Sequence, residues 1–340
     1  MKILITGGAG FIGARLARVL LARGTLAGQP LRQLVLADQA LPPSDLCADA
    51  RVQLRTGPLL AACEALREEA FDGVFHLASA VSGECETDFD LGLRSNLDST
   101  RALLDALRHR AGQGGGPPTR LVFSSSIAVY GPDPAVPLPA VVGDDTLATP
   151  QTSYGTHKLI CEHLVADYTR KGYIDGRSAR LMTVTVRPGK PNGAASSFFS
   201  GIIREPLAGV ESICPVSPEV SHPVASPGRT VAGLIAVYEA SREAFKGRLA
   251  LNLPALNVKV GEMLEALEQV AGKAVRARVR FERDERIAGI VANWPTGASA
   301  ARAGALGLQA DSSFADIIRQ YIADCEASTN AAEALKGLAR

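Results

Sequence analysis

The sequence predicts an α/β protein with a doubly wound parallel sheet and a smaller, partly discontinuous α/β unit toward its C-terminal end. Short apolar runs alternate with amphipathic segments of helical length, which is the pattern of repeated βαβ units. Glycine, proline or polar residues bound these runs, as expected for strands covered by helices on both faces. A length of 340 residues, 46% hydrophobic and 21% charged, is enough for a large core and an appended unit.

Seven apolar runs predict the strands, at residues 2–6, 33–37, 52–56, 73–77, 120–124, 182–187 and 249–253. Amphipathic segments predict helices at residues 11–23, 59–69, 89–110, 153–170 and 229–241. Past about Pro188 the alternation loosens, and two later helices are expected at 260–270 and 314–324. We therefore expect a larger domain of residues 1–187 with about 229–254, and a smaller domain of residues 188–228 with about 255–340.

Charge and cysteine usage narrow the class of protein. Thirty-six basic and thirty-five acidic residues leave a formal charge of +1, which gives no support to nucleic-acid or membrane-surface binding. The six cysteines are scattered and form no CxxC pair, so the spacing predicts no metal or redox motif and fits a reducing compartment. No secretory leader and no apolar run of about 20 residues is recognisable. We expect a cytoplasmic protein.

A glycine-rich turn lies at the start of the chain. Gly7, Gly10 and Gly13 directly follow the first expected strand and begin the first helix. Gly7 can adopt the backbone angles of a tight turn, Gly10 lets the main chain approach a pyrophosphate, and Gly13 allows close helix–strand contact. The helix N-terminus supplies amide donors and a partial positive charge. This context predicts a dinucleotide site in a Rossmann-type domain.

An acidic residue at the end of the second expected strand favours NAD as the dinucleotide. Asp38 follows the apolar run 33–37. A carboxylate at this place accepts hydrogen bonds from the adenosine ribose hydroxyls and repels a 2′-phosphate. The alternative, a glycine turn without a ligand beside a solvated aspartate, is disfavoured by the strand and helix that flank the turn.

A tyrosine and a lysine are spaced for chemistry on an alcohol. Tyr154 and Lys158 are four residues apart in an expected helix and therefore share one face. An ammonium beside a phenol favours the phenolate, which a general base for an alcohol requires. Upstream, the fifth expected strand leads into Ser124, Ser125 and Ser126, at the edge of the sheet where such sites lie. Each motif alone is common, but both together behind a nucleotide turn predict an active site.

Five motifs occur in one order along residues 1–190: Gly-Gly-Ala-Gly-Phe-Ile-Gly from residue 7, His-Leu-Ala-Ser from residue 76, Asn96, Ser-Ser-Ser-Ile-Ala-Val-Tyr-Gly from residue 124, and Tyr-Gly-Thr-His-Lys from residue 154. As a set they resemble the extended short-chain dehydrogenases/reductases, the superfamily of NAD-dependent nucleotide-sugar epimerases and dehydratases. One departure is Pro58, which stands where the superfamily usually has an aspartate that meets the adenine. That contact is expected to be missing or replaced.

The resemblance implies roles for individual residues. Ser126 would hydrogen-bond the substrate oxygen, Tyr154 would be the acid/base, and Lys158 would hold the nicotinamide ribose. Asn96 would support a water and backbone network near the lysine. The implied cofactor-binding set is Gly7, Gly10, Phe11, Ile12, Gly13, Asp38, Gln39, Leu77, Ala78, Ser79, Asn96, Tyr154, Lys158 and Pro188. The implied substrate-binding set is Ser125, Ser126, Tyr154, Lys190, Asn192 and Arg229.

Segments after residue 185 carry the signal for the substrate. Residues 186–198, 202–207 and 221–229 fit the sugar-nucleotide pattern poorly and are similar to the D-erythronate dehydrogenase branch of the superfamily. This resemblance implies NAD-dependent oxidation of the C2 hydroxyl of a small sugar acid, D-erythronate, to 2-oxo-D-erythronate. Lys190 and Arg229 are candidates to bind the carboxylate, unless they are solvated cations. Asn192, Ser197 and His222 are weaker candidates for binding the hydroxyls.

Two other functions stay open at this point. A nucleotide-sugar epimerase or dehydratase would return the hydride and release no NADH. A non-catalytic sensor of NAD would not need the tyrosine and the lysine. The helices at 89–110 and 153–170 resemble those of a dimer interface in this superfamily, so a homodimer is expected.

Overall fold

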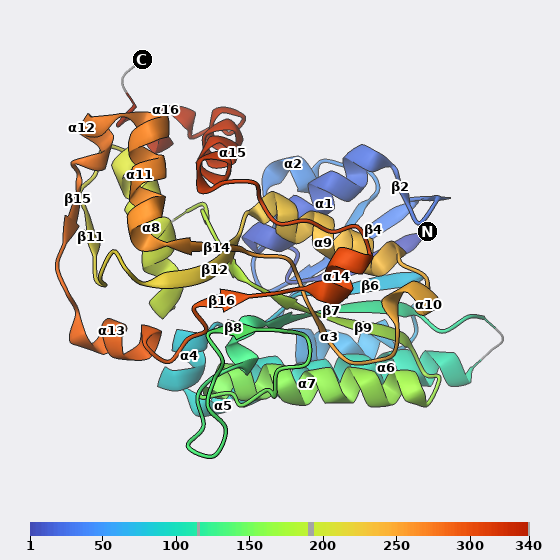
Figure 1. The fold of residues 1–340 in the computed structure, drawn as a ribbon. Helices are drawn as coiled ribbons and strands as arrows, with labels where there is room; N and C mark the ends of the chain where they lie inside the picture. Colours follow the sequence, from blue (N-terminus) through green and yellow to red (C-terminus); the bar gives the residue numbers. More distant parts are fainter. Residues whose placement is uncertain (114–115, 190–193, 339–340) are drawn as a thin grey trace.

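The computed structural model of the chain describes residues 1–113, 116–189 and 194–338, and a parallel β-sheet lies at its centre (Figure 1). Within the described residues this sheet has seven strands in the order β13-β9-β7-β6-β1-β4-β5, all parallel. The strands are β1 (Lys2–Thr6), β4 (Gln33–Asp38), β5 (Val52–Thr56), β6 (Gly73–His76), β7 (Arg120–Ser126), β9 (Asp175–Leu181) and β13 (Leu251–Asn252). The strand order reverses direction between β1 and β6, and a crevice at that switch point is where open α/β sheets bind ligands.

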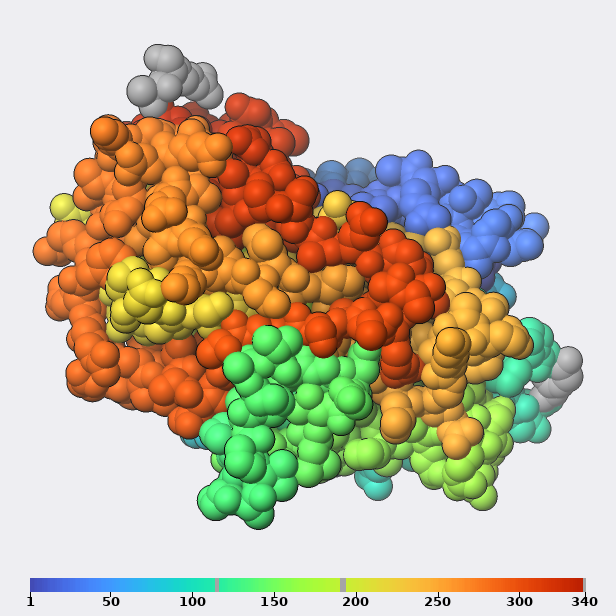
Figure 2. Space-filling model, in the orientation of Figure 1, coloured from blue at the N-terminus to red at the C-terminus, as the bar shows by residue number. Residues whose placement is uncertain are grey.

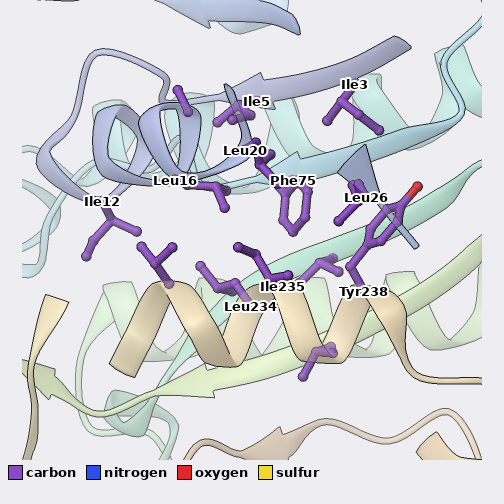
Figure 3. Close-up of a cluster of buried hydrophobic side chains, with 14 of the residues drawn as sticks. Ile3, Ile5, Ile12, Leu16, Leu20, Leu26, Phe75, Leu234, Ile235 and Tyr238 are labelled. Atoms are coloured by element: carbon purple, nitrogen blue, oxygen red, sulfur yellow. The ribbon is translucent and has the colours of Figure 1, made fainter. Parts of the chain in front are cut away.

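Helices cover both faces of the sheet because the strand side chains alternate between two cores. Ile3 and Ile5 pack on the face covered by α1 (Phe11–Arg23) and α9 (Pro227–Glu239), where Figure 3 shows them beside residues of both helices. Leu4 points to the opposite face, covered by α3 (Leu59–Leu66), α6 (Ser99–Gly112) and α7 (Ser153–Arg170). Helices therefore shield both faces of the sheet from solvent, which explains why the strands are almost continuously apolar.

A second hydrophobic core lies outside this sheet. It is built mainly by α8 (Phe198–Leu207), α11 (Val260–Ala271) and α15 (Phe314–Glu326). In the space-filling view the orange and red C-terminal segments form this lobe and also extend across the sheet domain (Figure 2). The division of the chain into two domains at the predicted boundaries stays a proposal, and this separate core supports it.

The remaining elements are short. A three-stranded sheet joins β10 (Thr183–Val184), β12 (Ser221–Ala225) and β14 (Leu256–Lys259), and two-stranded sheets complete the strands of the described residues. Their strands are β2 (Thr25–Leu26) with β3 (Gln29–Pro30), β11 (Ser212–Cys214) with β15 (Val279–Phe281), and β8 (Val141–Val142) with β16 (Gly297–Ala298). The short helices are α2 (Ser44–Cys47), α4 (Ser82–Thr87), α5 (Phe89–Gly92), α10 (Arg242–Phe245), α12 (Lys273–Arg276), α13 (Glu285–Val291), α14 (Ala301–Ala305) and α16 (Ala331–Ala334).

Two expected elements differ from the structure. The prediction of a sheet strand at 182–187 is wrong, because the sixth sheet strand is β9 and residues 183–184 belong to the smaller sheet. Arg177 in β9 is fully buried and donates to the carbonyls of Val237 and Tyr238 at 2.7 and 2.6 Å, so a charged residue occupies a core position. The helix expected at 89–110 is interrupted by a π-helical turn over Leu93–Asp98.

A buried ion pair fastens α7 to the sheet. Arg180 in β9 donates to both carboxylate oxygens of Glu162 in α7, at 2.8 and 2.7 Å, and both side chains are buried. Ser125 of β7 donates to the same carboxylate at 2.5 Å. Arg180 also donates to the Tyr130 hydroxyl at 2.6 Å, and that hydroxyl lies 2.9 Å from the side-chain oxygen of Asn252 in β13. One charged network therefore connects α7 with three adjacent strands.

We expect Glu162→Gln to lower the free energy of unfolding by about 3 kcal/mol, because removing one partner leaves the buried Arg180 charge uncompensated. Urea unfolding followed by circular dichroism measures the change. The matched control is Asp167→Asn on the same helix, where an exposed pair with Arg170 is lost, and a change under about 1 kcal/mol is expected. An equal effect of the two substitutions would contradict the role given to the buried pair.

Candidate active site

A large cleft runs along the carboxyl ends of the central strands. It is lined by the loops after β1, β4, β6 and β7 and by segments of the second lobe, and encloses about 1700 Å³. Sites for one small ligand typically enclose roughly 300–1,000 Å³. The cleft therefore has room for a dinucleotide together with a second, smaller molecule.

The glycine turn forms one wall of this cleft. Gly7 has a φ of 73° and its amide donates to the Ala37 carbonyl at 2.8 Å. A Cβ at Gly13 would lie 2.0 Å from the carbonyl oxygen of Gly7, so only glycine permits this contact between α1 and the turn. Gly10 is the N-cap of α1 and has no side chain to cap the helix, which leaves the first-turn amides facing the cleft. These features fit a bound pyrophosphate.

Asp38 lies at the end of β4 on the same wall. Its two carboxylate oxygens accept from the amides of Ala9 at 2.9 Å and Ala40 at 3.0 Å. Each oxygen keeps a further lone pair, so the carboxylate can still accept from ribose hydroxyls. Pro58, at the N-cap of α3, also lines the cleft.

A hydrogen-bonded relay fixes the loop after β6. The amides of Leu77 and Ala78 both donate to the Thr6 hydroxyl at 3.2 Å. Thr6 and Thr100 hydroxyls lie 2.7 and 2.8 Å from the two ring nitrogens of His76. Burial, with the nearby Lys158 ammonium, lowers the pKa of His76 to about 3, so its imidazole is neutral.

The tautomer of His76 follows from its partners. The Thr100 hydroxyl donates to the Asn96 carbonyl at 2.6 Å, so it accepts from Nε2 of His76. Nδ1 then accepts from the Thr6 hydroxyl. The direction of every proton in the relay is thereby assigned by hydrogen-bond logic.

Asn96 lies behind the cleft rather than in its wall. It is buried in the π-helical turn, and its side-chain oxygen accepts from the Ser79 hydroxyl at 3.1 Å and from the Ala80 amide at 2.7 Å. Its side-chain nitrogen donates to the Ala80 carbonyl at 3.2 Å. Asn96 therefore holds the loop that lines the cleft.

The three serines at the end of β7 have different partners. Ser124 donates to the His76 carbonyl at 3.1 Å, and Ser125 donates to Glu162 and is buried. Ser126 is only partly buried, and its oxygen accepts from the Ala128 amide at 3.1 Å. Because that bond uses the oxygen as acceptor, the Ser126 hydroxyl proton stays available to a ligand in the cleft.

Tyr154 and Lys158 lie on one face of α7 and both line the cleft. The Lys158 ammonium is buried, donates to the Ser124 carbonyl at 2.8 Å and lies 5.5 Å from the centroid of the Tyr154 ring. A Cβ at Gly155 would lie 2.1 Å from the Ala128 carbonyl oxygen, so glycine lets the first turn of α7 approach the turn after Ser126 closely. The local sequence therefore brings the serine and the tyrosine to the same part of the cleft.

The opposite wall comes from the second lobe and the small sheet. His222 is stacked on Phe199, with ring centroids 4.9 Å apart, and its centroid lies 5.2 Å from that of Trp294. Its Nε2 lies 2.7 Å from the Thr183 hydroxyl, and burial lowers the pKa of His222 to about 4. Arg187 also lines this wall, and the sequence analysis did not select it or Thr183. Thr183 begins β10 and Arg187 follows it by three residues, so their place in the cleft becomes visible only once β10 pairs with β12.

The structure brings most of the predicted residues together. The members that line the cleft are Gly7, Gly10, Phe11, Ile12, Gly13, Asp38, Gln39, Leu77, Ala78, Ser79, Ser125, Ser126, Tyr154 and Lys158. Pro188 is exposed outside this lining. Arg229 is exposed on α9 and lines a separate small cavity beside Thr230. Lys190 and Asn192 lie outside the described residues.

The sheet order, the glycine cradle and Asp38 define a dinucleotide-binding protein of the Rossmann type. The chain belongs to the NAD dependent epimerase/dehydratase family, whose model matches residues 3–218. The predicted fold class, the family resemblance and NAD as the cofactor are thereby confirmed. Along residues 1–113, 116–189 and 194–338, no helix has both the length and the apolar character needed to cross a membrane.

Relatives with nearly the same length are known. A D-erythronate dehydrogenase of Cupriavidus necator is 50% identical over 95% of this chain and 98% of its own length. A D-erythronate dehydrogenase of Haemophilus influenzae is 41% identical over 95% of this chain and 99% of its own. A crystal structure described as a nucleoside-diphosphate-sugar epimerase from Agrobacterium tumefaciens is 44% identical, with a TM-score of 0.89 over 95% of this chain and 94% of that one.

We expect Gly13→Ala to raise the dissociation constant of NADH by roughly tenfold or more. The new methyl group would clash with the Gly7 carbonyl and push the glycine turn away from α1. Titration of NADH fluorescence measures the constant. The control is Gly289→Ala, where the added Cβ meets no described atom within 4 Å and the constant should not change. Similar constants for both variants would contradict the role of the cradle.

Proposed function

We propose that the chain oxidises the C2 hydroxyl of a small sugar acid, converting D-erythronate to 2-oxo-D-erythronate with NAD. The observation that carries the proposal is the buried Lys158 ammonium beside Tyr154, in the same cleft as the glycine turn. The two full-length relatives named D-erythronate dehydrogenase support this choice of substrate. The enzyme is then an NAD-dependent oxidoreductase acting on a secondary alcohol.

In the proposed mechanism three side chains act on the C2 hydroxyl. Tyr154, as the phenolate, removes the hydroxyl proton, while Ser126 donates a hydrogen bond to the same oxygen. The Lys158 ammonium stabilises the phenolate and is itself held by the Ser124 carbonyl. NAD, when bound, accepts the hydride that leaves C2 as the carbonyl forms. Tyr154 ends the step protonated and passes its proton to solvent.

The cofactor would be held in the glycine half of the cleft, which is the part lined by the glycine turn, Asp38 and the loop after β6. We assign the pyrophosphate to the amides of Gly10, Phe11, Ile12 and Gly13, and the adenosine ribose to Asp38 with Gln39. Leu77, Ala78 and Ser79 would flank the cofactor, and Asn96 is a positioning residue because it acts through Ser79 and Ala80. The assembly expected from the superfamily, a homodimer through the segments 89–110 and 153–170, stays a prediction.

The accumulation of free NADH during turnover distinguishes the proposed dehydrogenase from an epimerase, a dehydratase or a sensor of NAD. With D-erythronate and NAD, we expect a steady rise in NADH absorbance, and none with UDP- or GDP-sugars. An epimerase, as the Agrobacterium tumefaciens structure is described, or a dehydratase would transform a nucleotide sugar without accumulating NADH. A sensor of NAD would turn over neither. Either of the last two results would contradict the proposal.

We expect Tyr154→Phe to lower kcat by roughly 10²- to 10⁴-fold, because the alcohol loses its general base. The dissociation constant of NADH should stay within about twofold, since the glycine turn and Asp38 are untouched. The control is Tyr168→Phe on the same helix, whose hydroxyl donates to Asp105 at 2.7 Å, and which should keep kcat. Loss of NADH binding together with kcat in Tyr154→Phe would point to a structural role for this tyrosine.

A further inference from the structure

Arg187 is a cation in the wall of the cleft, and the described part of the chain supplies no carboxylate partner for it. It is partly buried, and its Nε and Nη2 donate to the Val184 carbonyl at 2.9 Å and to the Ser196 hydroxyl at 3.1 Å. Among the described residues, no carboxylate oxygen lies within 4.0 Å of its guanidinium, and no atom accepts a hydrogen bond from its Nη1. Burial lowers the pKa of Arg187 from its ordinary value, which means that this cation is poorly solvated. Buried charges are normally paired.

The other described cations of the cleft are different. Lys158 is engaged by the Ser124 carbonyl, and Arg94 and Arg286 are exposed to water. Arg204 lies behind Arg187, donates to its carbonyl at 2.9 Å and is paired with Glu205 at 2.5 Å. Arg187 and Arg204 repel each other, and the Glu205 carboxylate is bound to Arg204. Among the described cations that line the cleft, Arg187 is therefore the partly buried one whose Nη1 has no described hydrogen-bond partner.

The position of Arg187 relative to Tyr154 fits a particular anion. Arg187 and Tyr154 line the same cleft, so a ligand bound there can face both the cation and the proposed base. In a 2-hydroxy acid, the carboxylate is attached to the carbon that carries the reacting hydroxyl. A cation that binds the carboxylate must therefore line the same cleft as the base, whereas Arg229 lines a separate small cavity.

We propose that Arg187 binds the carboxylate of the substrate acid and thereby orients its C2 hydroxyl toward Tyr154; this inference rests on the proposed function. The hydrogen bonds from Nε and Nη2 fix the plane of the guanidinium, and Nη1 supplies the donors for the substrate. The substrate carboxylate then takes the place of the missing counter-ion. The specificity of the site for an acid over a neutral polyol follows from the cost of leaving this cation unpaired.

The test compares D-erythronate with its neutral amide, D-erythronamide, in the wild type and in Arg187→Gln. We expect the wild type to prefer the acid in kcat/KM, and the ratio of the two kcat/KM values to fall roughly 30-fold or more in the variant. Both substrates meet the same fraction of folded enzyme, so the ratio is insensitive to partial unfolding. If the variant is too slow to assay, equilibrium binding of the acid and the amide to the enzyme–NADH complex gives the same ratio.

Control variants make the outcome decisive. Arg286→Gln removes an exposed cation of the same cleft and should leave the ratio within about twofold of the wild type. Arg187→Lys keeps the charge but not the planar fork, so part of the preference for the acid should return. An unchanged ratio in Arg187→Gln, or a fall in Arg229→Gln instead, would overturn the assignment. So would a raised dissociation constant of NADH in Arg187→Gln with the ratio intact, because Arg187 would then bind the cofactor.

Failure of the inference is distinguishable from failure of the proposed function. If the wild type oxidises D-erythronate but Arg187→Gln discriminates as well as the wild type, only the role of Arg187 is wrong. If the wild type transforms a nucleotide sugar and shows no preference for the acid, both statements are wrong.

Discussion

The ion pair between Arg180 and Glu162 is the constraint on which the rest of the site depends. Glu162 lies one turn after Lys158 and two turns after Tyr154 on α7, so holding its carboxylate against β9 fixes where both side chains reach the cleft. The neighbouring strand β7 holds the same helix through two adjacent residues. Ser125 donates to Glu162, and the Ser124 carbonyl accepts from Lys158. Helix and strand are thereby locked in register at the place where proton transfer is proposed.

The two halves of the cleft differ in how they present positive potential. The glycine half uses backbone amides and a helix N-terminus, which favour an anionic pyrophosphate without any formal charge. A neutral His76 stabilises the adjoining loop, and its burial keeps a second positive charge away from Lys158. The substrate half instead contains a formal cation, Arg187, held by a carbonyl and a hydroxyl. In the proposed function, recognition of the cofactor and of a small acid is thus separated by the kind of group that each half uses.

The parts of the site that are local in sequence could be predicted, and the parts that depend on distant contacts could not. The glycine turn is one strand–turn–helix unit, and Tyr154 with Lys158 is a four-residue spacing, so both follow from short-range geometry. The strand β9 was missed because Arg177 and Arg180 are buried in it, and only carbonyls of α9 and the carboxylate of Glu162 explain how. Arg187 and Arg229 are both arginines in the segments after residue 185, and the sequence alone does not tell which of them reaches the substrate. Their difference lies in which cavity each one lines.

A cation beside the reacting carbon also bears on the choice between oxidation and epimerisation. Inverting a stereocentre through a keto intermediate requires the hydride to return to the opposite face, so the reacting carbon must turn while a distant group stays bound. A carboxylate held one bond away from C2 prevents that rotation, because the anchor and the reacting carbon move together. The cleft wall at His222 is backed by aromatic packing, because Phe199 is stacked on the imidazole and Trp294 lies beside it, and the Thr183 hydroxyl holds Nε2, which favours a fixed surface. The proposed clamp at Arg187 therefore favours a single oxidation followed by release of the oxo acid and NADH.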